Sequence, residues 1–325
     1  RDSGDRWMVV EIDESDGTHH NLEPDYVLCN FLELDHLNYY DGLEDIIGSM
    51  VDFYESNERL KEGFINLDCE GNRQFAQRVD MRPTGYSTEH ASEFHGELLG
   101  RDQLPITFQA FRRRESLGEF ELNLPGLYNT VNAMGAIAVC ARIGVDPEAI
   151  REGLATYEGV ENRFTISRGG GVTIVKDYVS HPTGIQKVLE SARDLGDGRL
   201  ISVFKPYRYT LIDYLKDEYG ESFQESDHAV ITKMYAADEE PIPGVDTQTV
   251  CDSIRDFGVD VTYLPDEDDI KPTLHEMVEP GDIVVIFGGD DFFQMAEQFE
   301  AELAQKAGET EEMPQQPRVD GPLTE

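Results

Sequence analysis

The second half of the chain alternates short apolar runs with segments in which apolar residues recur every three to four positions. Apolar runs of five to eight residues are typical of strands buried on both faces of a sheet, and the longer spacing is typical of amphipathic helices. From Arg163 onward, the pattern predicts an open parallel sheet with helices on both faces. The expected strands are 171–178, 200–204, 228–232, 260–264 and 282–287, and the expected helices are 183–195, 211–222, 247–257, 270–278 and 292–304.

The first half is less regular, although it also predicts an α/β arrangement. Apolar runs at 7–11 and 26–32 predict two buried parallel strands, and a helical pattern follows Asp41-Gly42. Near Pro125 the pattern changes to two helices, the second of which has Asp146 as its N-cap and Pro147 in its first turn. Further short strands are expected at 63–67, 103–111 and 118–124, and the two helices at 128–143 and 147–157.

The length of 325 residues favours two domains, which we place at 1–160 and 161–305. The last segment, 306–325, is rich in Glu, Gln and Pro and lacks apolar periodicity, so we expect a disordered acidic tail. The chain starts with Arg1 and a charged stretch in place of an initiator Met, which suggests a fragment of a longer protein.

Charge and cysteine usage narrow the function classes. The net charge of −39, from 66 acidic and 27 basic residues, disfavours nucleic acid and anionic membranes as partners. No apolar run approaches the length of a membrane span. The four cysteines are scattered without metal-binding spacing, which suggests free thiols in the reducing cytoplasm.

Candidate chemistry lies where the first two predicted strands end. Glu11 closes the first apolar run, and Leu34-Asp35-His36 follows the second. Ligands gather at the carboxyl ends of parallel strands, and a carboxylate beside an imidazole can hold Mg²⁺ against a nucleotide phosphate. The alternatives are a capping carboxylate for Glu11 and a packed or surface histidine for His36. Residues Asp13, Glu14, Ser15 and Asp16 are expected to form the turn after the first strand, some of them as turn formers and N-caps.

Seven motifs, in order along the chain, resemble those of the Mur ligases. They are Asp13-Glu-Ser-Asp-Gly17, Leu34-Asp-His36, Gly126-Leu-Tyr-Asn-Thr-Val-Asn-Ala133, Asn162-Arg-Phe164, Asp177-Tyr-Val-Ser-His-Pro-Thr183, Val203-Phe-Lys-Pro-Tyr-Arg-Tyr209 and Tyr235-Ala-Ala-Asp-Glu-Glu-Pro-Ile-Pro-Gly-Val245. The resemblance implies the remainder of a central ATPase α/β domain followed by a C-terminal Rossmann-like domain. The family's N-terminal UDP-binding domain has no counterpart, and no G-x-x-x-x-G-K-[ST] phosphate loop occurs in the sequence.

The resemblance implies an ADP-forming ligase that uses ATP and Mg²⁺, most similar to the members that join L-alanine to UDP-N-acetylmuramate. In that reaction the γ-phosphoryl group passes to the lactyl carboxylate, and the amine of L-alanine attacks the acyl phosphate. Without its own phosphate loop, this chain alone is expected to be inactive. The alternatives are a muropeptide-recycling ligase and a non-catalytic binding module. A dehydrogenase lacks support, because no G-x-G-x-x-G follows the first strand of the second half.

The resemblance also implies roles for individual residues. The metal ligands would be Glu11 and His36. The residues that contact the nucleotide would be Asn129, Asn132, Arg163 and Asp177. The residues on the substrate side would be Asp35, Tyr178, His181 and Arg208. His36, His181 and Arg208 would be catalytic. Arg208 is suited to holding a carboxylate because a guanidinium group binds one bidentately.

Several positions depart from the family pattern. Tyr128 replaces a histidine, Ser180 replaces the first of two histidines, and Leu211 replaces an arginine. The stretch Lys205-Pro-Tyr-Arg208 replaces Gln-Pro-His-Arg. These changes make the choice of L-alanine a less secure expectation than the ligase class.

Overall fold

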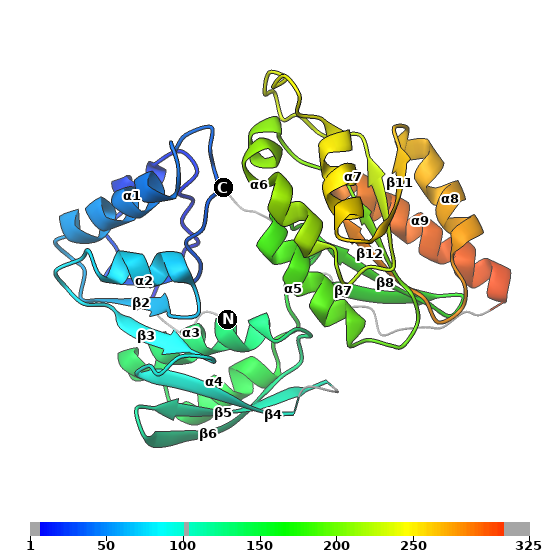
Figure 1. Ribbon diagram of the computed structural model, residues 1–325. Coiled ribbons are helices and arrows are strands. Elements are labelled where there is room, and N and C mark those ends of the chain that lie inside the picture. The colour runs from blue at the N-terminus through cyan, green and yellow to red at the C-terminus, as the bar shows by residue number, and fades with distance from the viewer. Residues whose placement is uncertain (1–6, 101–103, 309–325) are drawn as a thin grey trace, which may run out of the picture. The chain divides into compact units, whose positions relative to one another are not determined.

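The computed structural model describes residues 7–100 and 104–308. They divide into two compact units, each built on its own six-stranded sheet (Figure 1). The first unit runs to Gly159 and also includes Arg208–Lys216 and Ala236–Val245, and the second contains the remainder. Each unit is α/β, as the sequence predicts.

The sheet of the first unit has the strand order β1-β2-β3-β4-β5-β6. Strands β1 to β4 are parallel, and β5 and β6 continue the sheet as an antiparallel meander. The bounds are β1 Tyr26–Cys29, β2 Glu62–Asn66, β3 Thr84–Ser87, β4 Phe94–Gly100, β5 Ile106–Arg112 and β6 Glu115–Leu122.

Alternate residues of β2 show why both faces of this sheet are apolar. Phe64 packs in a core with aromatic residues of the neighbouring strands and with helices α3 and α4, whereas Ile65 packs in a second core with α1 and α2. Burying one such side chain contributes about 2–3 kcal/mol. The helices are α1 Leu43–Ser56, α2 Glu70–Ala76, α3 Tyr128–Ile143 and α4 Pro147–Ala155, and a short 3₁₀ helix, η1, covers Thr18–Asn21.

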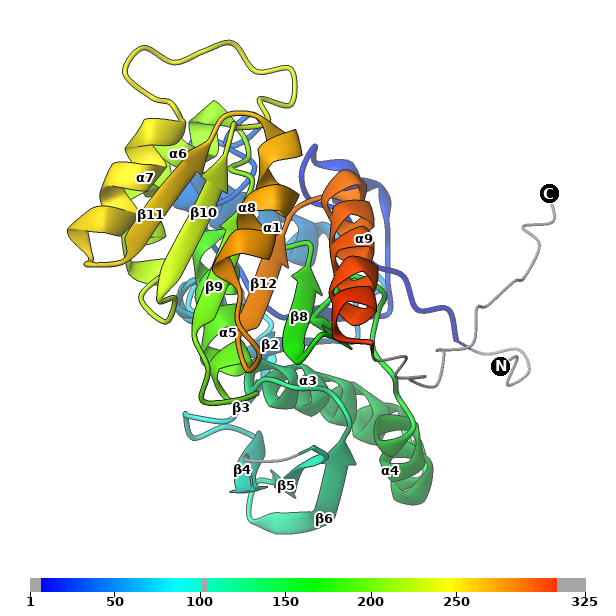
Figure 2. The same cartoon turned by 90° about the vertical axis from the view of Figure 1, so that its right-hand side faces the viewer.

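The sheet of the second unit has the order β11-β10-β9-β12-β8-β7, and only β7 is antiparallel to its neighbour (Figure 2). Alternate residues again serve two cores: Val203 faces helices α8 and α9, and Phe204 packs against Tyr219 and Phe223. The strands are β7 Thr165–Gly169, β8 Val172–Asp177, β9 Leu200–Phe204, β10 His228–Thr232, β11 Asp260–Leu264 and β12 Ile283–Phe287.

The helices of the second half follow the predicted strand–helix alternation. They are α5 Pro182–Arg193, α6 Tyr209–Ser222, α7 Thr247–Asp256, α8 Ile270–Met277 and α9 Asp290–Ala307, with a 3₁₀ turn, η2, at Glu267–Asp269. Helix α6 is kinked at Leu215, where the backbone leaves helical geometry. Helix α9 ends at Ala307, so the tail predicted from 306 begins two residues too early, and 309–325 lie outside the described residues.

One strand prediction is wrong. Residues 7–11 form an exposed coil that pairs with none of the described strands, so Glu11 does not end a strand. An apolar run becomes a strand only where a neighbouring backbone satisfies its N–H and C=O groups. Here the apolar side chains stay exposed, apart from a ring contact between Trp7 and Tyr26 at 5.8 Å.

Candidate functional site

His36 lies in the irregular segment after β1, in a backbone conformation with φ of 53°. Its Nε2 atom lies 3.0 Å from Glu14 Oε1, and its backbone N–H donates to Asp35 Oδ1 at 2.7 Å. The Tyr40 hydroxyl donates to the Glu14 carbonyl at 2.7 Å, and this contact ties the Glu14 turn to the His36 segment. The two segments thus present one imidazole and two carboxylates together.

The electrostatics of this group suit a cation. The hydrogen bond with Glu14 raises the pKa of His36 above its usual value, partial burial opposes the rise, and Asp35 adds to it. The same hydrogen bond lowers the pKa of Glu14. Carboxylate oxygens and an imidazole nitrogen form a donor set that fits a divalent cation, provided that the imidazole is neutral.

The use of Glu11 and His36 as metal ligands stays a prediction. Glu11 is exposed in the coil before the Glu14 turn, and the carboxylate that meets His36 is Glu14. We expected 13–16 to contain turn formers, and Asp13 and Asp16 do serve that purpose by accepting hydrogen bonds from the backbone N–H groups of Ser15 and Thr18. The contact between Glu14 and His36 was not foreseen from the sequence.

Asn129 and Asn132 lie together on the first turns of α3, as their spacing predicts. Asn132 Nδ2 donates to Asn129 Oδ1 at 3.1 Å, and Asn129 Nδ2 donates to the Pro125 carbonyl at 2.7 Å. Asn30, just beyond β1, joins them by donating to Asn132 Oδ1 at 2.5 Å, while its own Oδ1 accepts from Tyr86. A row of amides thus connects the end of β1 with α3.

Asp177, in the second unit, ends β8 and is buried. Its two oxygens accept hydrogen bonds from the backbone N–H groups of Phe164 at 2.9 Å and Val179 at 2.8 Å. Arg163 Nη1 lies 3.8 Å from the same carboxylate, and the Arg163 side chain is 59% exposed. Burial raises the pKa of Asp177 despite these contacts. The carboxylate ties the residue before β7 to the loop after β8 and leaves the guanidinium group accessible.

Tyr178 and His181 follow Asp177 on the same strand-end loop. The Tyr178 hydroxyl donates to Asp290 Oδ1 at 3.2 Å, and its ring packs against Phe293. His181 is the N-cap residue of α5, and its backbone carbonyl accepts a hydrogen bond from the Ile185 N–H.

Arg208 immediately precedes α6 with φ of 62°, and its backbone carbonyl accepts a hydrogen bond from the Ile212 N–H. Tyr178 and His181 follow the carboxyl end of β8, the edge at which ligands gather in parallel sheets, and Arg208 follows the end of β9.

Lys205, noted in the sequence only as a departure from the family pattern, connects several strand-end loops of the second unit. Its Nζ atom lies 2.8 Å from both Glu267 and Asp291, and it also lies over the rings of Tyr235 and Phe292. Burial lowers the pKa of Lys205, but the two carboxylates outweigh this effect and raise it. Pattern reasoning could not find this cross-link, because its partners come from distant parts of the chain.

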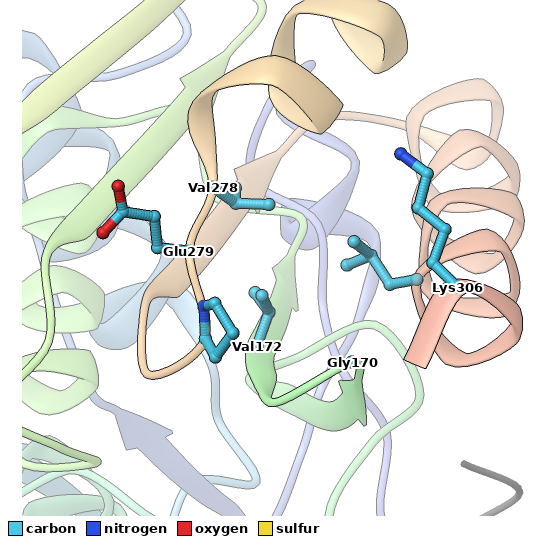
Figure 3. A pocket seen from close by; sticks show the side chains of 7 residues that line it. Gly170, Val172, Val278, Glu279 and Lys306 are labelled. Atoms are coloured by element: carbon cyan, nitrogen blue, oxygen red, sulfur yellow. The ribbon is translucent and has the colours of Figure 1, made fainter. Parts of the chain in front are cut away.

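The second unit also has an open pocket of about 210 Å³, which lies away from these residues. Gly170 and Val172 line it together with the turn before β12 and the end of α9, and Glu279 and Lys306 are its charged residues (Figure 3). It therefore opens at the edge where β8 begins, whereas Asp177 lies where β8 ends. This pocket is not the candidate site.

Relatives with assigned names match most of the chain. Proteins named UDP-N-acetylmuramate–L-alanine ligase are 34% identical over 307 residues in Salinibacter ruber and 33% identical over 287 residues in Anaeromyxobacter dehalogenans. These alignments cover 93% and 88% of this chain but only 64% and 62% of the relatives. The chain thus spans less than two thirds of the length of these relatives.

Solved structures show the same fold at lower sequence identity. The UDP-N-acetylmuramate–alanine ligase MurC of Thermotoga maritima matches with a TM-score of 0.70 and 18% identity, over 91% of this chain and 63% of that chain. A murein peptide ligase from Psychrobacter arcticus matches with a TM-score of 0.62 and 19% identity, over 88% and 59%. At these identities the similarity concerns the fold.

Two family models account for most of the sequence. The Mur ligase middle domain matches residues 2–140, and the Mur ligase glutamate ligase domain matches residues 162–289. Among the described residues, no helix is both long and apolar enough to cross a membrane. The two domain matches, the named relatives and the shared fold together show that this chain belongs to the Mur ligase family.

Proposed function

We propose that the protein containing this chain joins L-alanine to the carboxylate of UDP-N-acetylmuramate with the cleavage of ATP to ADP, as a step of peptidoglycan precursor synthesis. The observation that carries the proposal is the identity of 30–34% to enzymes of that name over 87–93% of this chain. In this proposal, 1–160 is the ATP-binding central domain, 161–305 is the C-terminal domain, and the reaction takes place in the cytoplasm.

The proposed metal is Mg²⁺, with His36 as a ligand. Glu14 supports this assignment because its carboxylate lies 3.0 Å from the imidazole, an arrangement in which a carboxylate orients a metal-binding histidine. Glu11 remains a proposed ligand from the family resemblance, and Asp35 is the nearby carboxylate on the substrate side. When bound, Mg²⁺ neutralises charge on the phosphates; the protein residues hold and orient it.

The proposed nucleotide contacts are the amides of Asn129 and Asn132, together with Arg163 and Asp177. A side-chain amide can donate to and accept from the edge of a purine, and Asn129 and Asn132 are fixed side by side by their mutual hydrogen bond. The sequence has no phosphate loop of the G-x-x-x-x-G-K-[ST] type, so the proposal requires phosphate-binding groups from outside this chain. This requirement agrees with the partial coverage of the relatives.

The amino-acid side is proposed to include Tyr178, His181 and Arg208. The muropeptide-recycling reaction is the specific competitor, because Ser180, Lys205 and Leu211 depart from the pattern expected for addition of alanine. Leu211 is buried, with 5% of its surface exposed, so it offers no polar group to a substrate.

A competition assay tests the proposal. The full-length protein containing this chain is incubated with ATP, Mg²⁺, UDP-N-acetylmuramate and equal concentrations of L-alanine and the L-alanyl-γ-D-glutamyl-diaminopimelate tripeptide. The mass of the nucleotide-sugar product identifies the added group. The proposal expects the alanyl product to predominate. A predominant tripeptide product would assign the recycling reaction, and formation of neither product would support a non-catalytic binding module.

A further inference from the structure

A second group of metal-binding side chains lies in the first unit, apart from the Glu14–His36 pair. Asp68 follows β2 by two residues, and Glu89 and His90 follow β3. One ligand atom from each of the three residues lies within 4.8 Å of the others. Because β2 and β3 are parallel neighbours, their carboxyl ends bring these residues together from two separate loops.

Asp68 provides a fixed oxygen pair at the centre of this group. Its carboxylate accepts hydrogen bonds from the Ser87 hydroxyl, the Thr88 N–H at 2.8 Å, the Thr88 hydroxyl at 3.1 Å and the Glu89 N–H at 3.3 Å. Only 11% of its side chain is exposed. An oxygen ligand held in this way loses little conformational freedom when it binds a cation.

His90 supplies a nitrogen at a separation that suits metal coordination. Its Nδ1 atom lies 3.0 Å from Asp68 Oδ1. Two ligands that each lie about 2.1 Å from a metal ion, at an angle of about 90–110°, are about 3.0–3.4 Å apart. A metal ion can therefore take the place of the proton between Nδ1 and Oδ1, with a rotation of the exposed His90 imidazole that points Nδ1 at the ion.

Glu89 completes the set. Its carboxylate is exposed and makes no hydrogen bond or ion pair in the described part of the chain, so it is able to turn toward a cation. Arg73, in helix α2 after Asp68, forms an ion pair with Glu70 and donates to the Leu67 carbonyl. These contacts of the nearby cation therefore do not involve Glu89. With His90 neutral, the group of Asp68, Glu89 and His90 carries a charge of −2, which a divalent cation neutralises.

We propose that Asp68, Glu89 and His90 bind a divalent transition-metal ion of the Zn²⁺ class, which links the loop after β3 to the end of β2. Mixed imidazole and carboxylate ligands favour such ions, whereas Mg²⁺ prefers a shell of oxygen atoms alone. The site is independent of the proposed ligase reaction. Its effect is to stabilise the first unit, because an ion that binds only the folded chain raises the free energy of unfolding.

The test is a calorimetric titration of the metal-free chain with Zn²⁺, using H36A as the parent so that zinc at the Glu14–His36 pair does not contribute. The test variants add E89Q or H90A, and the matched control adds E97Q, which changes an exposed carboxylate on β4. The Asp68 carboxylate is left in place because it orders the turn.

The parent and the E97Q control are expected to bind one Zn²⁺ and to melt at a higher temperature with zinc present. E89Q and H90A are expected to bind at least about tenfold more weakly and to lose most of that increase. Millimolar Mg²⁺ is expected not to displace the zinc. The proposal is overturned if the parent binds no zinc saturably, or if E89Q and H90A bind as tightly as E97Q.

Discussion

Glu14 Oε1 lies 3.0 Å from His36 Nε2, although the two residues are 22 positions apart in the sequence. The contact joins the turn before η1 to the segment after β1, and it places a carboxylate behind the imidazole proposed to hold Mg²⁺. His36 adopts a positive φ that is uncommon for a residue with a side chain. The surrounding contacts from Asp35, Tyr39 and Tyr40 keep it there.

The first prediction concerns this pair. Replacing Glu14 by Gln keeps the shape of the side chain but removes the charge that orients His36. In the full-length protein, the Mg²⁺ concentration that gives half-maximal ADP release should rise about tenfold or more. The exposed Glu23 offers a matched control, E23Q, which should leave that concentration unchanged. An E14Q enzyme with the Mg²⁺ requirement of the wild type would show that the pair is only structural.

The second prediction concerns the row of amides. Replacing Asn132 by Ala removes the group that accepts from Asn30 and donates to Asn129. The affinity for ATP should fall about tenfold, which corresponds to about 1.4 kcal/mol. Isothermal titration of the full-length protein measures this change. In the matched control N123A, which loses a hydrogen bond to the Ala155 carbonyl, the affinity should stay the same. Equal affinities for ATP in the two variants would show that Asn132 is not part of the nucleotide site.

The third prediction compares two helical glycines. A Cβ atom on Gly71, in α2, would lie 1.9 Å from the Leu32 carbonyl oxygen, so Gly71→Ala should lower the free energy of unfolding by about 2 kcal/mol or more. Gly48, in α1, has open space at the same position, so Gly48→Ala should raise it by up to about 1 kcal/mol. Urea denaturation measures both values. A neutral Gly71→Ala variant would contradict the close approach of α2 to Leu32.

The fourth prediction concerns pH and the second unit. Asp227 Oδ2 accepts from Arg193 at 2.8 Å and from the Leu200 N–H at 2.7 Å. Burial raises the pKa of Asp227, but these hydrogen bonds outweigh burial and lower it below 3.8. A lowered carboxyl pKa gives stability that is present above the unfolded value and is lost as the pH falls through the folded value.

Asp227→Asn should therefore lower the free energy of unfolding by about 1 kcal/mol at pH 7, a modest value because the side chain is half exposed. The difference between variant and wild type should shrink as the pH falls below about 4. Urea unfolding at pH 7, 5 and 3.5 measures it. A difference that stays constant over this range would show that the charge of Asp227 contributes nothing to stability.

The sequence predicts the central strands of the second sheet well because they are buried on both faces. Apolar runs predict β9 and β10 at their observed bounds, and the edge strand β11, which is only partly buried, is also predicted at its bounds. Helix α3 is predicted at its observed bounds from its high Ala content and from Gly144. By contrast, β3, β4, β7 and α2 are not predicted. Strand β3 is Thr-Gly-Tyr-Ser and β7 is only partly buried, so neither presents a clear apolar run. Strand β4 is exposed over its second half, so it also lacks an apolar run. Helix α2 has only seven residues, about two turns, and it packs against Leu32, which is distant in the sequence.

The candidate site is predictable to the extent that its residues follow strand ends. Asp177 ends β8, and Asn129 and Asn132 lie at the start of α3, as expected, whereas His36 lies seven residues beyond the end of β1. The contacts of Glu14 with His36 and of Asn30 with Asn132 were not foreseen, because each joins residues that are distant in the sequence. The same holds for the ion pair between Lys205 and Asp291. The path of the chain, including positive φ angles at His36 and Arg208, sets these contacts, and local patterns do not encode it.

The most direct measurement of the central claim is ADP release by the full-length protein containing this chain, in the presence of ATP and Mg²⁺. The account predicts sustained ADP release only when UDP-N-acetylmuramate and L-alanine are both present, together with the matching amount of the alanyl product. Absence of ADP release with both substrates present, or release that does not depend on L-alanine, would contradict it.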